Sequence, residues 1–313
     1  VFGAIGFVAV VFALGMWGDG GSEMAFSAAM KLMKWYPLLT LPLFVYMGYM
    51  LSESGLADDL YRMFHVWMGP VRGAMNGLSV AGMAIGASIA LPELLRRGYD
   101  KVMVTGVIQA GSSLGILVPP SVVLVLYGMI ARQPVGQLWL AGVFPGLMMA
   151  GMFILYIAVR CWIQPNMGPA LSKEERAEIT LSEKIGLLKA GVVPLFIFFS
   201  MTGLFLMGIT SLVESSAVGA LAATLAALAK RRLNRSVMEE TLRKTLSISC
   251  MFMWIILAAL AFGAVFDGLG AVKAIEGFFV DKLGLGPWQI LIMMQISFIL
   301  MGMFLDDTAM LVI

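Results

Sequence analysis

Two adjacent prolines stand in the middle of an apolar stretch, surrounded by small and hydroxyl side chains. The stretch reads QAGSSLGILVPPS, and the prolines are Pro119 and Pro120. A proline in a helix interior removes a backbone donor and costs about 3 kcal/mol or more, and lipid offers no water to satisfy the freed carbonyl groups. We predict a broken helix whose exposed backbone groups bind an ion or a substrate; the alternative is a structural kink. The candidate binding residues are Gly111, Ser112, Ser113, Gly115, Pro119, Pro120 and Ser121.

A second candidate site is the polar entry to an apolar run, GITSLVESSAVGAL at 208–221. A carboxylate well inside the bilayer costs about 2.5–3.5 kcal/mol on insertion scales, so Glu214 needs a partner or contact with water. Two interpretations stay open. In the first, Thr210 and Glu214 bind an ion or a substrate. In the second, Thr210 or Ser211 caps the helix, and Glu214 lies near the positive helix start.

The third candidate is the acidic stretch GMFLDDTAM at 302–310. It follows an apolar segment from Pro287 that is short for a full crossing and suits a re-entrant hairpin whose tip reaches the bilayer midplane. Such a tip could ligate a cation, whereas the alternative is an ordinary loop at the far surface. The candidate residues are Gly302, Asp306, Asp307 and Thr308.

The composition indicates a helical membrane protein. Of the 313 residues, 60% are hydrophobic and 13% are charged, whereas soluble domains have about 25% charged residues. The formal charge of +2 gives no indication of a nucleic-acid partner. We therefore predict an all-α polytopic membrane protein. Spans are expected at 1–17, 37–51, 102–130, 138–162, 190–209, 212–229 and 247–266, with shorter apolar segments at 76–94 and 289–313.

The order of these pieces repeats within the chain. Amphipathic segments at 55–73 and 268–286 each follow a long apolar span, and the longest hydrophilic linker lies between the halves. Such an internal repeat is typical of secondary transporters. Positive charge concentrates in 95–101, 163–189 and 230–246, so we predict that these loops are cytoplasmic.

Several motifs occur in the order expected of one known family. They are LPLFVYMGYMLSESGLADDL, LPELLRRGYDK, AGSSLGILVPPSVVLVLYG, LWLAGVFPGLMMA, TSLVESSAVGAL and GMFLDDTA. From about residue 35 onward the chain resembles DctM, the large membrane subunit of the tripartite ATP-independent periplasmic (TRAP) transporters.

The resemblance implies a sodium-driven importer of small organic acids in the bacterial inner membrane, not an enzyme. It further implies a periplasmic substrate-binding protein (DctP-type) and a small membrane subunit (DctQ-type) as partners. The implied fold is an inverted repeat with two re-entrant hairpins and broken helices that works as an elevator. Na⁺ is the expected coupling ion, and its ligands are expected among 111–121, 210–215 and 302–308.

On this basis we divide the chain by function. Residues 1–75 hold the scaffold spans and amphipathic arm of the first repeat, and 76–162 hold the first hairpin and the broken helix. Residues 163–189 form the linker, 190–286 the spans and arm of the second repeat, and 287–313 the start of the second hairpin. The tip at AGMAIGA is shorter than the family pattern, and TSLVESSA lacks a proline that the family has. Because both ends lie inside apolar runs, we expect the full protein to extend beyond them.

Two other functions remain to be weighed. A proton-coupled exchanger with broken helices would need a titratable pair, for which Asp306 and Asp307 are the adjacent candidates. An intramembrane hydrolase would pair Ser112, Ser113 or Ser121 with His65, the one histidine. His65 lies in an amphipathic segment where a snorkelling ring is expected, and no oxyanion motif is present, which disfavours this alternative.

Overall fold

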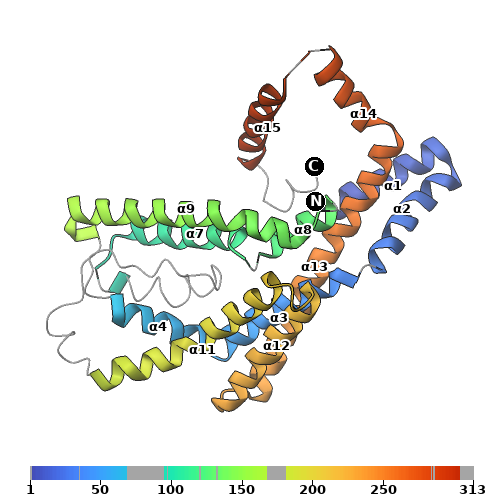
Figure 1. Cartoon of the computed structure of the whole chain (residues 1–313). Helices are drawn as coiled ribbons and strands as arrows, with labels where there is room; N and C mark the ends of the chain where they lie inside the picture. Colours follow the sequence, from blue (N-terminus) through green and yellow to red (C-terminus); the bar gives the residue numbers. More distant parts are fainter. Residues whose placement is uncertain are drawn as a thin grey trace. The chain divides into compact units, whose positions relative to one another are not determined.

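The computed structural model describes residues 2–34, 36–68, 95–96, 98–119, 121–131, 133–167, 181–282, 284 and 286–303. These residues form helices and turns, with no strand among them (Figure 1). The predicted all-α architecture is confirmed for this part of the chain. The helices are α1 (Phe2–Trp17), α2 (Asp19–Met33), η1 (Tyr36–Leu39), α3 (Thr40–Glu53), α4 (Leu56–Met68), α7 (Lys101–Leu117), α8 (Val122–Ile130), α9 (Val135–Ile163), η3 (Pro165–Met167), α11 (Leu181–Leu206), α12 (Leu212–Ala229), α13 (Arg235–Gly268), α14 (Ala271–Glu276), the π-helical η4 (Gly277–Lys282) and α15 (Pro287–Gly302).

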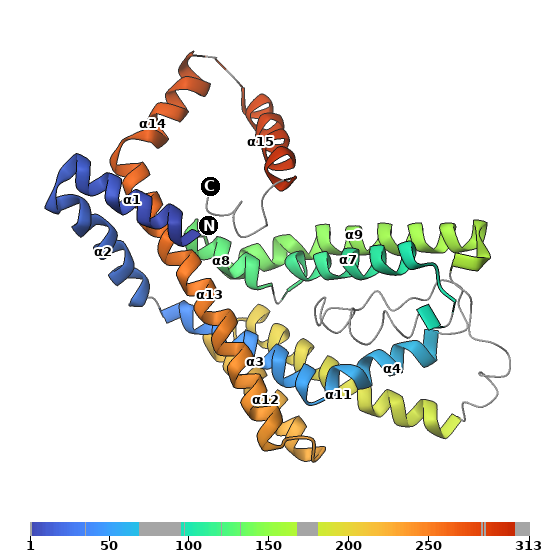
Figure 2. The same ribbon diagram turned by 180° about the vertical axis from the view of Figure 1, so that it is seen from behind.

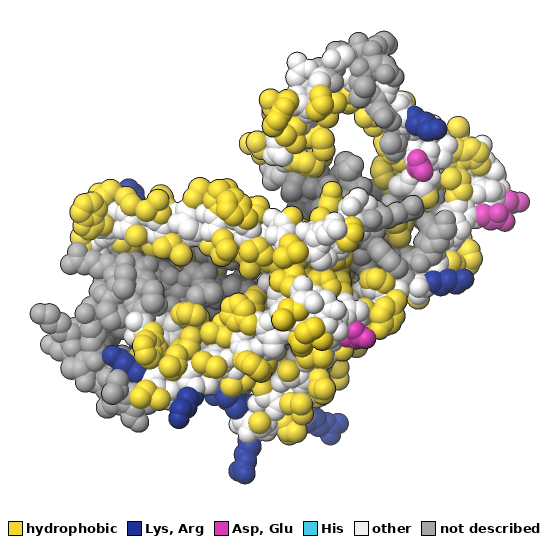
Figure 3. All heavy atoms as spheres, in the orientation of Figure 1, with side chains coloured by type: hydrophobic (Ala, Val, Ile, Leu, Met, Phe, Trp, Pro, Cys, Tyr) yellow, Lys and Arg dark blue, Asp and Glu magenta, His cyan; other side chains and the backbone are white. Residues whose placement is uncertain are grey.

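Four of the described helices are long and apolar enough to cross a membrane, and they carry large hydrophobic side chains on their outer faces. Figure 3 shows such side chains along α9, where Phe144 is 77% exposed and Trp162 is 79% exposed. Apolar surface on this scale is stable in lipid and not in water. The four are Val135–Ile163, Lys184–Leu206, Leu212–Ala229 and Arg235–Gly268.

Contacts within the chain define two compact units. One comprises Val1–Leu38, Ile130–Arg132 and Ser247–Ile313, and the other comprises Leu39–Met129 and Gln133–Leu246. In the first unit α1 packs beside α2, as both ribbon views show (Figures 1 and 2). The same unit buries small residues of α1 against Val265 of α13.

The second unit contains two of the three predicted sites. Its centre is α12, which packs against α3 and α11, while α11 also packs against α4. Small residues allow this close approach: a Cβ on Gly219 would lie 2.7 Å from the sulfur atoms of both Met47 and Met201. Without a hydrophobic drive between helices in lipid, such small-residue contacts are the usual basis of helix association. In the same unit α7 lies along α9.

Three predicted segments differ in the structure. The last predicted span, 247–266, is part of one continuous helix, Arg235–Gly268, so most of the predicted loop 230–246 is helical and the turn covers only 230–234. The linker predicted at 163–189 likewise ends at Leu181, where α11 begins. Charged side chains spaced along a helix can extend it beyond the bilayer, which a search for apolar runs does not detect. The predicted sidedness of these segments stays a prediction.

Both amphipathic segments are helical near their starts. The first forms α4, and the second forms α14 followed by the π-helical turn η4. In each case a glycine with left-handed backbone directly precedes the helix: φ is +68° at Gly55 and +70° at Gly270. Glycine adopts this conformation without the steric cost that a Cβ imposes.

Candidate functional site

The helix predicted to break at the proline pair is interrupted there. α7 ends at Leu117, residues 118 and 119 bend away, and α8 begins at Val122, while Pro120 lies outside the described residues. The N–H of Val118 still donates to the Leu114 carbonyl at 2.9 Å, which closes the last turn of α7. The interruption separates two half-helices, as expected for a broken membrane helix.

Ser121 begins the second half-helix. Its Oγ accepts the N–H of Leu124 at 3.2 Å, its carbonyl accepts the N–H of Val125 at 3.2 Å, and its side chain is fully buried. A serine in this position satisfies one of the four free N–H groups that every helix start presents. The buried Ser121 hydroxyl therefore lies at the interruption itself, and its hydrogen bond with the Leu124 N–H fixes its position.

The other two predicted hydroxyls bond to their own helix. Ser112 donates to the Gln109 carbonyl at 2.8 Å, and Ser113 donates to the Ala110 carbonyl at 2.7 Å. Such back-bonding uses the hydroxyl hydrogen and leaves oxygen lone pairs available. Gly111 and Pro119 are buried, whereas Ser112, Ser113 and Gly115 are partly exposed, so this stretch of α7 lies partly at the surface of the described structure.

Helix α9 packs directly on the break through two glycines. A Cβ on Gly142 would lie 2.5 Å from the Leu117 carbonyl oxygen, and one on Gly146 would lie 2.8 Å from Cγ2 of Val118. The small-xxx-small spacing of these glycines is the pattern that lets membrane helices approach closely. The α9 backbone therefore covers the interruption on one side and leaves no room there for a side chain on either glycine.

The same helix is held to its neighbours by a buried aromatic cluster. Trp139 is fully buried, with its ring centroid 5.7 Å from that of Phe44 on α3 and 5.0 Å from that of Phe205 on α11. At its far end α9 buries Cys161 against Met103 and Val104 of α7. α9 thus fixes the broken helix within the bundle.

The second predicted site is the junction between α11 and α12. Gly208 turns the chain with φ of +70°, and Ser211 caps α12. Glu214 Oε2 accepts the Ser211 N–H at 2.7 Å, while Ser211 Oγ accepts the Glu214 N–H at 3.3 Å. These two reciprocal bonds form a capping box. The predicted cap with Glu214 at the helix start is therefore present, and Glu214 is exposed.

Two further hydroxyls meet behind this cap. Thr210 Oγ1 and the fully buried Ser215 Oγ are hydrogen-bonded to each other, and Ser216 donates to the Val213 carbonyl at 2.7 Å. The structure thus brings Thr210 beside Ser215, whereas Glu214 turns back to its own helix start. A binding role for Thr210 and Glu214 stays a prediction.

The third predicted site is described only at its edge. Gly302 is the last residue of α15 and is exposed, whereas Asp306, Asp307 and Thr308 lie outside the described residues. The tip of the first predicted hairpin, within 76–94, also lies outside them, as does the side chain of His65. Among the residues described, no group of three or more His, Cys, Asp or Glu side chains lies together to hold a metal ion.

Gly142 and Gly146 were not predicted as part of a site. Their signal is present in the sequence as GVFPG, in which two glycines flank Pro145 at the small-xxx-small spacing. The interruption itself was predictable from the prolines, but the helix that encloses it could only be found from the fold.

Apolar helices of spanning length together with an interrupted apolar helix are typical of a secondary transporter. The family model described as "Tripartite ATP-independent periplasmic transporter, DctM component" matches residues 1–313. The chain therefore belongs to the DctM family, the large permease subunits of TRAP transporters. Its predicted multi-pass placement in the inner membrane is confirmed by this family and by the apolar spans.

Curated relatives agree with the family match. The chain is 28% identical over 295 residues to the C4-dicarboxylate TRAP transporter large permease protein DctM of Pseudomonas aeruginosa, covering 89% of this chain and 67% of that protein. The protein of the same name from Rhodobacter capsulatus is 25% identical, with coverages of 89% and 68%. The isethionate TRAP transporter permease protein DctMQ of Oleidesulfovibrio alaskensis is 23% identical, with coverages of 89% and 45%.

Proposed function

We propose that this chain forms the membrane pathway by which a TRAP transporter imports a small organic acid, driven by an inward sodium gradient. Substrate arrives from a periplasmic binding protein, and a small membrane subunit completes the permease. Movement of the broken-helix region against a fixed bundle, as in an elevator, carries the substrate across. The family and the names of the relatives, C4-dicarboxylate and isethionate permeases, support an acidic substrate.

The interruption at 118–121 is the observation that carries the proposal. It combines the carbonyl end of α7, the amide end of α8 and the buried Ser121 hydroxyl. Half-helix ends of opposite polarity serve cations and carboxylates respectively. Sodium takes neutral oxygen ligands, and backbone carbonyls with serine and threonine hydroxyls supply these at both junctions.

The physical drive for such import is the membrane potential together with the sodium gradient. Each net positive charge carried inward gains about 2.3 kcal/mol per 100 mV. The membrane potential therefore adds to the drive only when the sodium ions outnumber the negative charges of the substrate, and otherwise the sodium gradient alone supplies it. The runner-up, a proton-coupled exchanger, would follow the pH gradient, so the two functions differ in a measurable way.

The deciding test is uptake into proteoliposomes that hold this chain with its small membrane subunit. Radiolabelled C4-dicarboxylates and isethionate are offered with and without the cognate binding protein, and with an inward gradient of Na⁺ or of K⁺. We expect uptake that requires both Na⁺ and the binding protein. Uptake that ignores Na⁺ and follows an imposed pH gradient would overturn sodium coupling in favour of the exchanger.

A further inference from the structure

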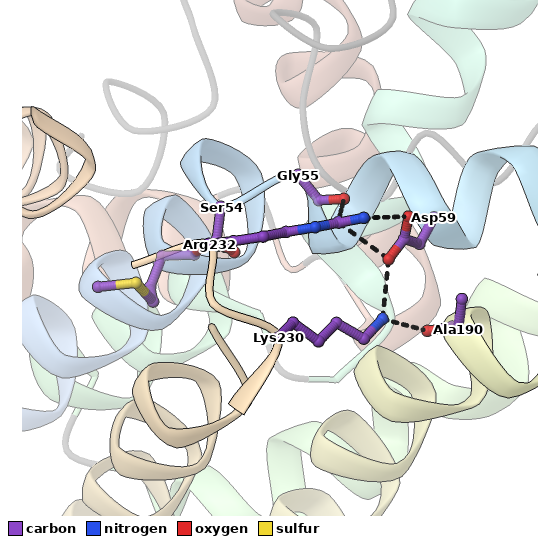
Figure 4. A network of polar contacts seen from close by, with 7 residues as sticks. Ser54, Gly55, Asp59, Ala190, Lys230 and Arg232 are labelled. Carbon is purple, nitrogen blue, oxygen red and sulfur yellow. Dashed lines mark hydrogen bonds and ion pairs between the residues drawn. The ribbon is translucent and has the colours of Figure 1, made fainter. Parts of the chain in front are cut away.

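A buried carboxylate on the first amphipathic helix binds two cations from a distant part of the chain. Figure 4 shows Asp59 of α4 facing Lys230 and Arg232, which follow α12. Lys230 Nζ lies 2.8 Å from Asp59 Oδ2, and the Arg232 guanidinium lies 2.9 Å from Oδ2 and 3.0 Å from Oδ1. This cluster, here called the corner clamp, is not part of either helix junction.

The carboxylate of the clamp is largely shielded from water, whereas the side chains of Lys230 and Arg232 reach the surface. Asp59 is only 8% exposed. Burial alone acts to raise its pKa, but hydrogen bonds from Lys230 and Arg232 outweigh this and hold the pKa below the usual value for an aspartate. The carboxylate is therefore charged whenever the clamp is assembled, and removing it would leave two cations without their partner.

The same cations also bind backbone carbonyls at the corner and on a third helix. Arg232 Nη1 donates to the Gly55 carbonyl at 2.8 Å, and Lys230 Nζ donates to the Ala190 carbonyl of α11 at 3.2 Å. A second ion pair joins Glu53, the last residue of α3, to Lys244 of α13 at 2.8 Å. The clamp thus joins the α3–α4 corner, the turn after α12 and helix α11.

Gly55 would be the natural flexing point of this arm because its backbone is left-handed and carries no side chain. The Arg232 guanidinium lies across it and binds both its carbonyl and Asp59, four residues on. Along the rest of α4, Met63 packs so closely on Gly191 of α11 that a Cβ there would lie 2.6 Å from its sulfur. Trp67 Nε1 donates to the Lys184 carbonyl at 3.3 Å. The α3–α4 corner is therefore fixed at several points.

The corresponding corner of the second repeat is built differently. Gly270 is also left-handed, but among the described residues no salt bridge joins α14 to another helix. α14 then passes directly into the π-helical turn η4. The two arms share their sequence order, but in the part of the chain that the structure describes the ionic clamp is found at the first arm and not at the second.

We propose that Asp59 is a positioning residue that locks the Gly55 corner and makes α4 part of the fixed bundle, so that transport movement does not flex at this corner. This inference rests on the proposed transport function. In sequence α4 precedes the broken helix α7. An anchored α4 would keep the start of the chain that leads to α7 at a fixed place on α11, whereas a loose corner would let that place shift during transport.

The test uses hydrogen–deuterium exchange and uptake on the same samples, the permease with its small subunit in nanodiscs and in proteoliposomes. Asp59→Asn removes the clamp, and Asp59→Glu keeps the charge. Asp58→Asn is the matched control, because Asp58 is the adjacent half-buried carboxylate, which interacts with Asp59 and Arg232 through its charge but makes no salt bridge to a described residue. Arg232→Lys keeps the cation but loses the planar fork that spans two acceptors.

We expect Asp59→Asn to raise amide exchange in 54–68 by about 10-fold or more, since loss of one buried ionic partner leaves the others unpaired. Peptides of α12 should keep their protection. The maximal uptake rate should fall by about 10-fold while the apparent KM for substrate-loaded binding protein stays constant. Asp59→Glu should restore most of the amide protection and most of the uptake rate. Arg232→Lys should give values between those of Asp59→Asn and the unaltered chain, and Asp58→Asn should match the unaltered chain.

Unchanged exchange in 54–68 for Asp59→Asn, or an equal rise for Asp58→Asn, would overturn the clamp as the anchor of α4. Raised exchange with a normal uptake rate would show that the corner is anchored without any role in transport, which equally refutes a positioning residue. If Asp59→Asn also loses protection in α12, the substitution has disturbed the fold more widely. Exchange in 54–68 and the uptake rate of Arg232→Lys then decide the question. Absence of sodium-driven uptake by the unaltered chain would refute the proposed function, while the exchange data would still decide whether the clamp holds α4.

Discussion

The junction between α7 and α8 and the junction between α11 and α12 are closed in two different ways. At the first, a buried serine starts the new helix, and the carbonyl end of α7 lies against the backbone of α9 at Gly142. At the second, Gly208 turns the chain, and the reciprocal capping box of Ser211 and Glu214 satisfies the free N–H groups at the start of α12, while Glu214 stays exposed. The first junction depends on contacts with a distant helix, whereas the second is closed by local hydrogen bonds.

This difference predicts how each junction responds to change. A break enclosed by tertiary contacts should be sensitive to any added atom on the helix that covers it, because protein interiors leave little free volume. A junction closed by its own cap should lose only the free energy of that cap. Four substitutions, together with a matched control for the first, test this contrast, beginning with the largest expected effect.

Gly142→Ala should damage the first junction most. The new Cβ would lie 2.5 Å from the Leu117 carbonyl oxygen, a backbone atom that cannot rotate away. Overpacking of this kind destabilises by about 1–3 kcal/mol, and we expect sodium-driven uptake to be nearly lost. Thermal unfolding in detergent and uptake measure the two effects.

Gly151→Ala on the same helix is the matched control, because no atom lies within 4 Å of its added Cβ. It should leave uptake intact and raise stability slightly, as replacing a helical glycine does, by about 0.5–1 kcal/mol. An equal loss of stability and uptake with both substitutions would contradict the prediction. It would mean that the close contact of Gly142 with the Leu117 carbonyl is not the cause of the loss.

Ser121→Ala should have the next largest effect. It removes the buried acceptor of the Leu124 N–H and so costs about 1–2 kcal/mol. If the hydroxyl also ligates sodium, Ser121→Ala should raise the apparent KM for Na⁺ in uptake. Ser121→Thr retains a hydroxyl, so its apparent KM for Na⁺ should stay close to that of the unaltered chain. A stability loss with an unchanged KM for Na⁺ would restrict Ser121 to a capping role.

Ser211→Ala should cost about 1 kcal/mol, the usual value for loss of an N-cap hydroxyl. Its cap is local and exposed, so uptake should fall only as far as stability does. Thermal unfolding of this variant beside Ser121→Ala compares the two junctions directly. A complete loss of uptake by a stably folded Ser211→Ala would break the comparison and make the second junction a binding site.

Glu214→Gln should have the smallest effect on stability. Glutamine can accept the Ser211 N–H in the same capping box, and water screens the charge of the exposed carboxylate, so the free energy of unfolding should change little. The sodium dependence of uptake is the informative measurement. An unchanged apparent KM for Na⁺ supports a cap alone, whereas a rise of about 10-fold or more would assign the carboxylate to an ion site.

Much of the architecture could be predicted from residue types alone. The apolar spans and the interruption at the proline pair follow from hydropathy and from the missing proline N–H. The cap at Ser211 follows from a serine three residues before a glutamate. Helix ends in charged segments could not be predicted, because Arg235 to Leu246 reads as a polar loop and becomes part of α13 only by continuing an apolar helix.

The sequence by itself determined the class of protein, the family and the positions at which helices must break. These features depend on local chemistry, namely the solvent preference of each segment and the hydrogen bonds that its backbone can make. The tertiary structure alone decided which side chains meet across the chain, such as Asp59 with Lys230 and Arg232, 171 and 173 residues apart. It also decided that Gly142 covers the carbonyl end of α7. Such pairings depend on how helices pack in three dimensions, and no local pattern encodes the partner.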